Sequence, residues 1–306
     1  MAVSAGRTAL LQSNSVALRL DAPPDDAFAF LHGATGGSIW ADVVSQINAG
    51  EDFARKQLGP PQYDAFSVQI GLTVPELLFD WIAASWKPDP PRHDGALLLF
   101  NHNLAVQEER GFKRALLEET GFPALDASSK EAAYVTLRVA PTTILPDQKA
   151  QGASPVAFAP KHKLWLAANF KLQIDGLDCT HVSRIEPFAI HRKIEVVTAA
   201  DGSELTAGPV DFPNLRVTMS AAHAETWLAW HEDFVLSGHN TADFEKSGSI
   251  SLFAPNLVEL TRLQLNGLGI FRVTSEEMEV ERTGAIAHVI ADLYCEQMTL
   301  LPGGSP

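Results

Sequence analysis

Apolar and polar residues alternate along much of the second half of the chain, a pattern typical of strands with one buried face. Residues 164–174 and 182–197 alternate in this way, and Asp175–Gly176 between them is a turn sequence. Pro187 interrupts the second segment, because proline cannot donate a ladder hydrogen bond. A shorter strand is predicted at residues 215–219. These segments predict an antiparallel β structure.

Helical spacing replaces the alternation after residue 219. Five residues repeat at intervals of three and four: Trp227, Leu228, His231, Phe234 and Val235. Ser220 is placed to cap a helix that runs to about Leu236, and Gly238 would end it. Further β runs follow at residues 249–253, 258–265 and 285–298, with turns at 254–256 and 283–284.

The first half of the chain has the same order of elements. Strands are expected at residues 16–20, 38–44, 66–70, 96–100, 104–109 and 132–139, with a helix at 74–86. The predicted fold class is therefore mainly β (α+β), with one small antiparallel barrel or sandwich and one amphipathic helix in each half.

Two segments with the same glycine and phenylalanine positions indicate an internal repeat. Gly95-Ala-Leu-Leu-Leu-Phe100 and Gly248-Ser-Ile-Ser-Leu-Phe253 are 153 positions apart, and each is followed by an Asn-Leu pair. Two further blocks match, residues 65–81 with 214–230 and residues 133–139 with 287–293, at offsets of 149 and 154. Three blocks in one order at a nearly constant offset favour a tandem duplication.

The segment between the two copies has the composition of a linker. Residues 141–163 contain four prolines and a glycine and have no sustained apolar period. A length of 306 residues also suits two domains of about 150 residues. We therefore expect a first module at residues 1–145, a linker at 146–163 and a second module at 164–306.

The second copy carries a recognisable series of motifs. Trp227-x-x-Trp230-His231 on the helix is followed by a glycine, by Gly248–Phe253, by Glu259–Leu265 and by a long last strand ending near Leu300. This series resembles the tail-tube protein family of contractile phage tails (T-even type) and of tail-like contractile injection systems. The resemblance covers residues 165–301 and extends to the first copy through the repeat.

This resemblance implies a β-barrel module that packs into six-membered rings, and rings that stack around a lumen. The chain departs from the family in being double, so three chains would supply six modules. We expect a trimer with pseudo-sixfold symmetry, rather than a hexamer of double chains, that builds, starts or terminates the inner tube. The implied partners are further copies of the chain and neighbouring tube, sheath, baseplate or hub proteins. The chain would be made in the cytoplasm and then form part of a phage virion or injection particle.

Charge and cysteine content narrow the alternatives. The formal net charge of -14 disfavours nucleic acid or an anionic membrane as a specific partner. Only Cys179 and Cys295 occur, without a CxxC motif, so neither a disulfide framework nor a zinc site is expected. The first 20 residues lack a signal-peptide core, and nothing approaches 18 consecutive apolar residues.

No motif predicts catalysis, a metal or a cofactor. His223 and His231 are eight residues apart on the predicted helix, too far for a pair of metal ligands at i and i+4. The glycine-rich residues 33–38 lack the lysine of a phosphate-binding loop, and they are expected to form a hairpin or tight bend. Acidic pairs such as Glu118–Glu119 and Glu276–Glu277 fit a solvated surface. We therefore expect a structural protein and not an enzyme.

Two other classes of function stay open at this stage. One is a small-ligand carrier or enzyme built on a β-barrel, which would need a pocket with converging polar groups. The other is an effector that carries a tube-like domain. The elements expected to contact neighbours are edge strands and two long loops, at residues 47–62 and 199–209.

The residues singled out in the sequence have structural roles. The predicted core anchors are Trp81, Trp227, Trp230, Phe100 and Phe253, and the predicted turn glycines of the repeat are Gly95 and Gly248. Replacing a buried tryptophan at such a position by alanine is expected to lower the free energy of unfolding by about 3–5 kcal/mol.

Overall fold

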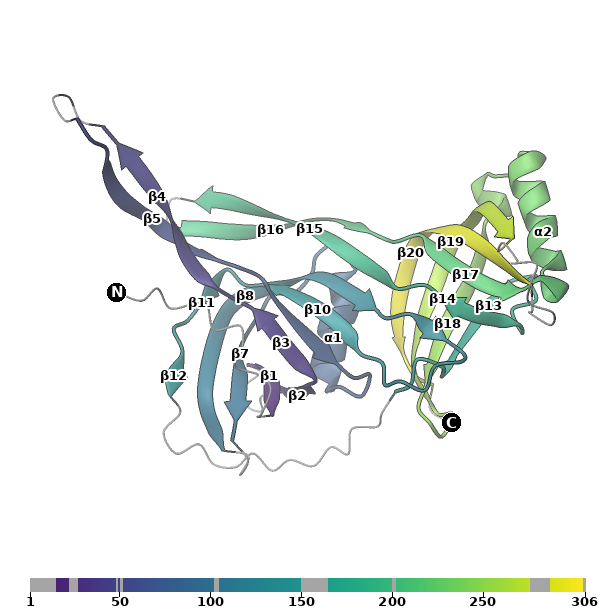
Figure 1. Ribbon diagram of the computed structural model, residues 1–306, viewed down its shortest axis with the longest axis horizontal. Coiled ribbons are helices and arrows are strands. Elements are labelled where there is room, and N and C mark those ends of the chain that lie inside the picture. Colours follow the sequence, from purple (N-terminus) through teal and green to yellow (C-terminus); the bar gives the residue numbers. More distant parts are fainter. Residues whose placement is uncertain are drawn as a thin grey trace, which may run out of the picture.

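The computed structural model describes residues 15–21, 27–47, 49, 52–101, 105–149, 165–199, 202–275 and 287–304. It is built from two large antiparallel sheets that lie side by side, with a long hairpin projecting from one end (Figure 1). The prediction of a mainly β fold is confirmed. Among the described residues, no helix is both long and apolar enough to cross a membrane.

The first sheet is formed mostly by the first half of the chain. Its main path runs in the order β2-β1-β7-β8-β10-β6-β3. These strands are β1 (Val16–Leu20), β2 (Ala27–Leu31), β3 (Gly33–Gly36), β6 (Phe66–Ile70), β7 (His93–Phe100), β8 (Val106–Phe122) and β10 (Val135–Ala140). The short strands β11 (Thr143–Ile144) and β12 (Gln148–Lys149) continue along β8.

The second sheet runs in the order β13-β18-β19-β20-β17-β14-β9. These strands are β9 (Leu125–Asp126), β13 (Phe170–Ile174), β14 (Val182–Ile185), β17 (Leu215–Ser220), β18 (Lys246–Phe253), β19 (Glu259–Ser275) and β20 (His288–Pro302). Without β2 and β9, the two sheets have corresponding strands in the same order, β1-β7-β8-β10-β6-β3 and β13-β18-β19-β20-β17-β14. A helix follows the corresponding strand in each: α1 (Glu76–Ser85) follows β6, and α2 (Glu225–His231) comes after β17.

Irregularities in the ladders recur as well. The pairing of β7 with β8 shifts between His93 and Gly95, and the pairing of β18 with β19 shifts between Lys246 and Gly248. The shift in the second half lies 153 positions after the shift in the first half, which is the offset predicted for the sequence repeat. Bulges are specific features of a fold, so their recurrence is stronger evidence of correspondence than strand order alone.

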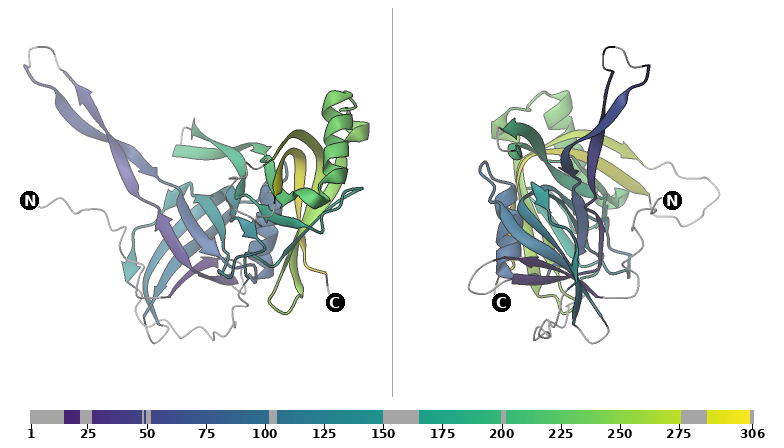
Figure 2. Two further views of the ribbon diagram at one scale, coloured as in Figure 1. Left: turned by 45° about the vertical axis from the view of Figure 1, so that its right-hand side comes forward. Right: turned by 90° about the vertical axis from the view of Figure 1, so that its left-hand side faces the viewer.

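Each half also has a long hairpin at the same point of its topology. In the first half β4 (Ile39–Gln46) and β5 (Arg55–Tyr63) follow β3, and in the second half β15 (Phe188–Ala199) and β16 (Gly202–Asp211) follow β14. The β4–β5 hairpin leaves the body of the molecule, whereas β15–β16 lies along the first sheet (Figures 1 and 2). The strand β5 contains two consecutive prolines, Pro60 and Pro61.

The two sheets share strands and a core. Strand β9, from the first half, pairs with β14, whereas β15, from the second half, pairs with β8. Buried apolar residues of both sheets form one contiguous cluster, which includes Trp81 and Trp227. The halves are therefore joined by backbone pairing as well as by the segment 146–163, of which residues 150–163 lie outside the described part.

The helical segment of the second half differs from its prediction. Residues 221–223 form a 3₁₀ turn, α2 follows, and residues 232–236 form a π-helical turn. Ser220 makes no capping hydrogen bond with its side chain, and Ala224 occupies the N-cap of α2. The predicted end at Gly238 agrees with the structure, since this residue has a φ of 75°.

Other boundaries were also predicted wrongly. The expected loops at 47–62 and 199–209 are largely strand, in β5 and β16. Glycine, proline and polar residues interrupt the apolar alternation along both strands, so periodicity did not predict them. The strand expected at 164–174 begins only at Phe170. The glycine-rich residues 33–38 form the strand β3 and then a bend at Gly36 and Gly37, both with positive φ. The predicted turn at 283–284 lies outside the described residues.

Candidate assembly surfaces

The predicted core anchors lie on the elements that the sequence assigned to them. Trp81, Trp227, Trp230 and Phe100 are buried, and Phe253 is half-buried. The indole Nε1 of Trp81 donates to the Pro91 carbonyl oxygen at 3.1 Å, and that of Trp227 donates to the Asp178 carbonyl oxygen at 2.8 Å. These bonds fix the helices against neighbouring loops. The energetic weight of each residue stays a prediction.

The two repeat glycines lie in strands, where a neighbouring backbone comes close. A Cβ atom on Gly95 would lie 2.2 Å from the Arg19 carbonyl oxygen, and one on Gly248 would lie 2.5 Å from the Gln173 carbonyl oxygen. Their part in the fold is therefore a close strand contact rather than a turn.

Within the described residues, no group of three or more His, Cys, Asp or Glu residues could hold a metal ion. His181 and His223 stack with ring centroids 3.5 Å apart, a contact that the sequence did not predict. The predicted assembly role would depend on the surfaces where the two halves of the chain meet each other or other chains.

The joint between the two halves is an antiparallel pairing of β15 with the last part of β8. Phe188 lies opposite Phe122, Ile190 opposite Thr120 and His191 opposite Glu119. Strand β7 covers β8 only as far as Ala115, so β15 takes the edge that β7 leaves open. The hairpin from the second half of the chain thus adds a strand to the sheet formed by the first half.

Arg192, next along β15, fastens the hairpin to helix α1. Its side chain is buried and donates through Nε to the Ser85 carbonyl oxygen at 2.9 Å and through Nη2 to the Lys87 carbonyl oxygen. A third bond joins Nη1 to the Gly208 carbonyl oxygen at 2.5 Å. A cation at the C-terminal end of a helix also interacts favourably with the helix dipole. A residue from the second half of the chain therefore caps the helix of the first half.

Aromatic rings fill the joint beneath these polar contacts. The rings of Phe122 and Phe188 stack with centroids 5.1 Å apart, and Trp86 contacts Phe122 edge-on at 6.4 Å. All three side chains are buried. Such packing contributes both buried apolar area and ring geometry to the joint.

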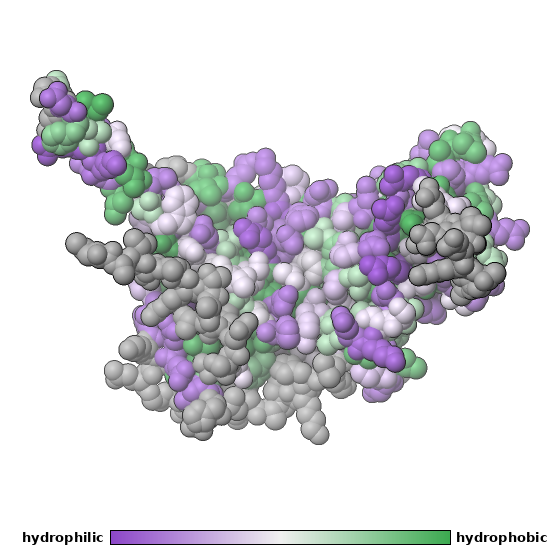
Figure 3. All heavy atoms as spheres, in the orientation of Figure 1, coloured by the Kyte–Doolittle hydropathy of each residue, from purple (hydrophilic) through white to green (hydrophobic). Residues whose placement is uncertain are grey.

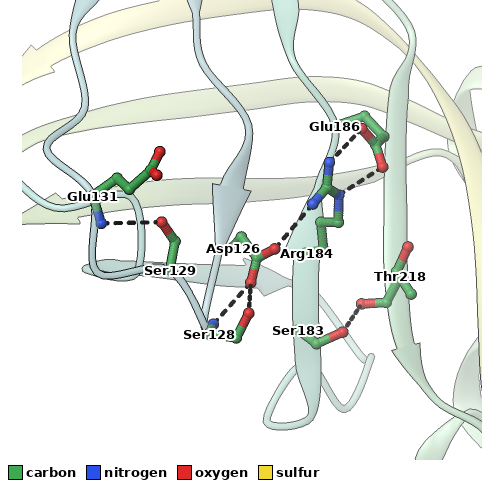
Figure 4. Close-up of polar contacts among 8 residues, drawn as sticks. All are labelled: Asp126, Ser128, Ser129, Glu131, Ser183, Arg184, Glu186 and Thr218. Atoms are coloured by element: carbon green, nitrogen blue, oxygen red, sulfur yellow. Dashed lines mark hydrogen bonds and ion pairs between the residues drawn. The ribbon is translucent and has the colours of Figure 1, made fainter.

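A second polar contact joins the modules at β9 and β14 (Figure 4). Arg184 donates to Asp126 at 2.9 Å and to Glu186 at 2.7 Å. Hydrogen bonds from Ser128, together with Arg184, hold the pKa of Asp126 below its usual range. The pair therefore stays charged to a lower pH than an unassisted aspartate would allow, although exposed ion pairs contribute at most about 1 kcal/mol.

The β4–β5 hairpin lies at the same point of the topology as β15–β16, but in the described part of the chain it pairs with no strand of either large sheet. Its ladder shifts between Ala41 and Val43, as the other shifts between Arg192 and Ile194. It exposes seven large apolar side chains: Ile39, Trp40, Val43, Val44, Ile47, Phe53 and Leu58. The surface view shows apolar residues along this projection, away from the body of the molecule (Figure 3).

Comparisons with known proteins find similarity only at the level of structure. No protein-family model matches the chain, and no curated protein matches it. A chain of the anti-feeding prophage tube-terminating cap is 18% identical, covering 49% of this chain and 100% of its own length with a TM-score of 0.38. A chain of the extended sheath–tube complex of an extracellular contractile injection system, PVC, is 14% identical, covering 44% and 88% with a TM-score of 0.36. A chain of the anti-feeding prophage baseplate is 12% identical, covering 44% and 91% with a TM-score of 0.32.

Replacing Arg192 by alanine is expected to lower the free energy of unfolding by about 3 kcal/mol, because buried carbonyl groups lose a charged donor. Thermal denaturation would show this as a lower Tm, and Arg192→Lys should recover part of the loss. Lys193→Ala is the control, since Lys193 is an exposed neighbour that forms an ion pair with the exposed Glu195. Equal Tm values for Arg192→Ala and Lys193→Ala would contradict the role of Arg192 as a cap.

Proposed function

We propose that the chain is a structural component of a phage tail or tail-like contractile injection system, made of two tandem tube-like modules. The observation that carries this proposal is the contact between the modules. Corresponding strands, bulges and hairpins recur in both halves, and the hairpin of one module docks on the sheet of the other. The two surfaces in contact are different, so the contact is of the head-to-tail kind that generates rings.

Three chains in a pseudo-sixfold ring are the assembly that this arrangement supports best. A head-to-tail contact repeated around an axis closes a ring when the rotation divides the circle. Six modules match the number that the family resemblance implies, and two modules per chain then require three chains. The ring would build, start or terminate an inner tube, in contact with further copies and with neighbouring tube, sheath, baseplate or hub proteins. No covalent chemistry is part of this role.

Negative-stain microscopy combined with light scattering tests the proposal. We expect rings of six lobes with a mass near three chains of 33.1 kDa each. Rings with six chains would contradict the trimer and favour a double-module hexamer. A monomer without rings at high concentration would contradict the assembly role, and stabilisation of that monomer by a small ligand would favour a carrier or an enzyme.

A further inference from the structure

We infer that the β4–β5 hairpin of one chain pairs with the open edge of β19 in a second copy of the chain, with Ser38 opposite Thr274, Ile39 opposite Val273 and Trp40 opposite Arg272. This inference rests on the proposed function and names the contact that would join one chain to the next. The template is the pairing of β15 with β8 within the chain. In the contact between chains, β4 takes the place of β15, and β19 of the second copy takes the place of β8.

The donor side of this contact corresponds residue by residue to β15. The matched ladder shifts make Ala41 and Val43 equivalent to Arg192 and Ile194, an offset of 151. By the same offset, the residues equivalent to 189–191 of the docked strand are residues 38–40. In the described part of the chain, β4 pairs only with β5, so the edge that β15 uses to bind β8 is open in β4.

The acceptor strand β19 corresponds residue by residue to β8, the strand that binds β15. The ladder between β8 and β10 shifts between Arg138 and Val139, which skips Glu118 on β8. The ladder between β19 and β20 shifts between Ile270 and Arg272, which skips Phe271, 153 positions later. Residues 119–121 of β8 therefore correspond to residues 272–274 of β19. Beyond Leu268, β19 pairs only with β20 among the described residues, so this edge is open.

Burial at matched positions differs as this inference requires. Ile190 in the docked hairpin is 2% exposed, whereas its equivalent Ile39 is 48% exposed. On the acceptor side Trp86, at the end of α1, is 7% exposed, whereas its equivalent Val235 is 40% exposed. Both surfaces thus expose apolar side chains at positions that are covered in the joint within the chain.

The second module also has a hollow where the hairpin would lie. It is lined by Phe234, Val235, Asn240, Ile270, Phe271 and Tyr294. This hollow adjoins the open edge of β19, and α2 lies on the outer side of the second module, away from the first (Figure 1). A hollow beside an open strand edge suits a hairpin that adds a strand and inserts side chains beside it.

Two differences make the contact between chains distinct from the one within the chain. His191 and Glu119, with Nδ1 and Oε2 3.5 Å apart, are replaced by Trp40 and Arg272, a pair suited to a cation–π contact. The position of Arg192 is taken by Ala41, so the contact between chains has no arginine cap for the helix. We therefore expect the contact between chains to dissociate more readily than the joint within a chain.

Paired cysteines test the predicted register. Ser38→Cys and Thr274→Cys replace two exposed side chains, and directly opposed residues on neighbouring strands bring their Cβ atoms within about 4.5–5.5 Å. Mild oxidation of the double variant at pH 8 should give cross-linked chains on a non-reducing gel, and neither single variant should. Burial raises the pKa of Cys179 and of Cys295 to about 11, so the native thiols contribute little background.

Two control variants make the test specific. Gly121→Cys with Ala189→Cys is the equivalent pair within the chain. It should form a disulfide within one chain, so the protein should still migrate as a single chain on the gel. Ser38→Cys with Val273→Cys is out of register by one residue and places the thiols on opposite faces, so it should not cross-link. Rings that form without a Ser38–Thr274 cross-link would overturn the inference while the proposed function stands. A monomer that neither forms rings nor cross-links at high concentration would overturn both.

Discussion

Gly248→Ala and Gly95→Ala are each expected to lower the free energy of unfolding by about 3 kcal/mol or more, at the upper end of the cost of overpacking. The added methyl carbon would lie 2.5 Å from the Gln173 carbonyl oxygen in the first variant and 2.2 Å from the Arg19 carbonyl oxygen in the second. Both atoms belong to the backbone of a paired strand, so they cannot move aside without breaking the ladder. Thermal or urea denaturation measures the loss.

Gly71→Ala is the matched control, because a Cβ atom there meets nothing within 4 Å. It should change the free energy of unfolding by no more than about 1 kcal/mol, in the stabilising direction. If Gly95→Ala and Gly248→Ala were as stable as Gly71→Ala, the close strand contact would not be the reason for these glycines.

Trp227→Ala should destabilise the protein by about 3–5 kcal/mol, the usual cost of deleting a buried aromatic side chain. The indole is fully buried, and its Nε1 donates to the Asp178 carbonyl oxygen, which would lose its partner. A fall in Tm measured by differential scanning calorimetry would show this, and Trp227→Phe should fall less. Leu228→Ala is the control, since that side chain is on the same helix and is 47% exposed. A Tm for Trp227→Ala equal to that of Leu228→Ala would contradict an anchoring role.

Local patterns predicted much of the framework. The strand at residues 66–70 and the strand at 16–20 were predicted with the bounds that the structure has. Residues 66–70 alternate strictly with one face buried, whereas 16–20 is a short apolar run in which Ala17 is buried as well. Gly95 and Gly248, 153 positions apart, could be singled out in the sequence because each lies where a neighbouring backbone leaves little room for a Cβ atom. Their spacing is consistent with the predicted repeat.

The joint between modules could not be predicted in the same way. Arg192 finds its acceptors on residues 107 and 105 positions earlier in the chain, and nothing near Arg192 in the sequence identifies them. Strand β5 was mistaken for a loop because its exposed surfaces carry polar residues and Pro60–Pro61 resembles a turn signal. Contacts of this kind depend on how two folded surfaces meet, and single-sequence periodicity does not contain that information.

The two prolines of β5 have a further consequence for the projecting hairpin. Successive residues of a strand direct their N–H groups to opposite edges, so one of Pro60 and Pro61 removes a donor from the outer edge of β5. A long exposed hairpin with two open edges would invite endless strand addition and aggregation. With one edge blunted by proline, the hairpin can accept a neighbouring strand along β4 alone. Growth by edge pairing is thereby limited to one direction, which protects the free chain from forming fibrils before it meets another copy.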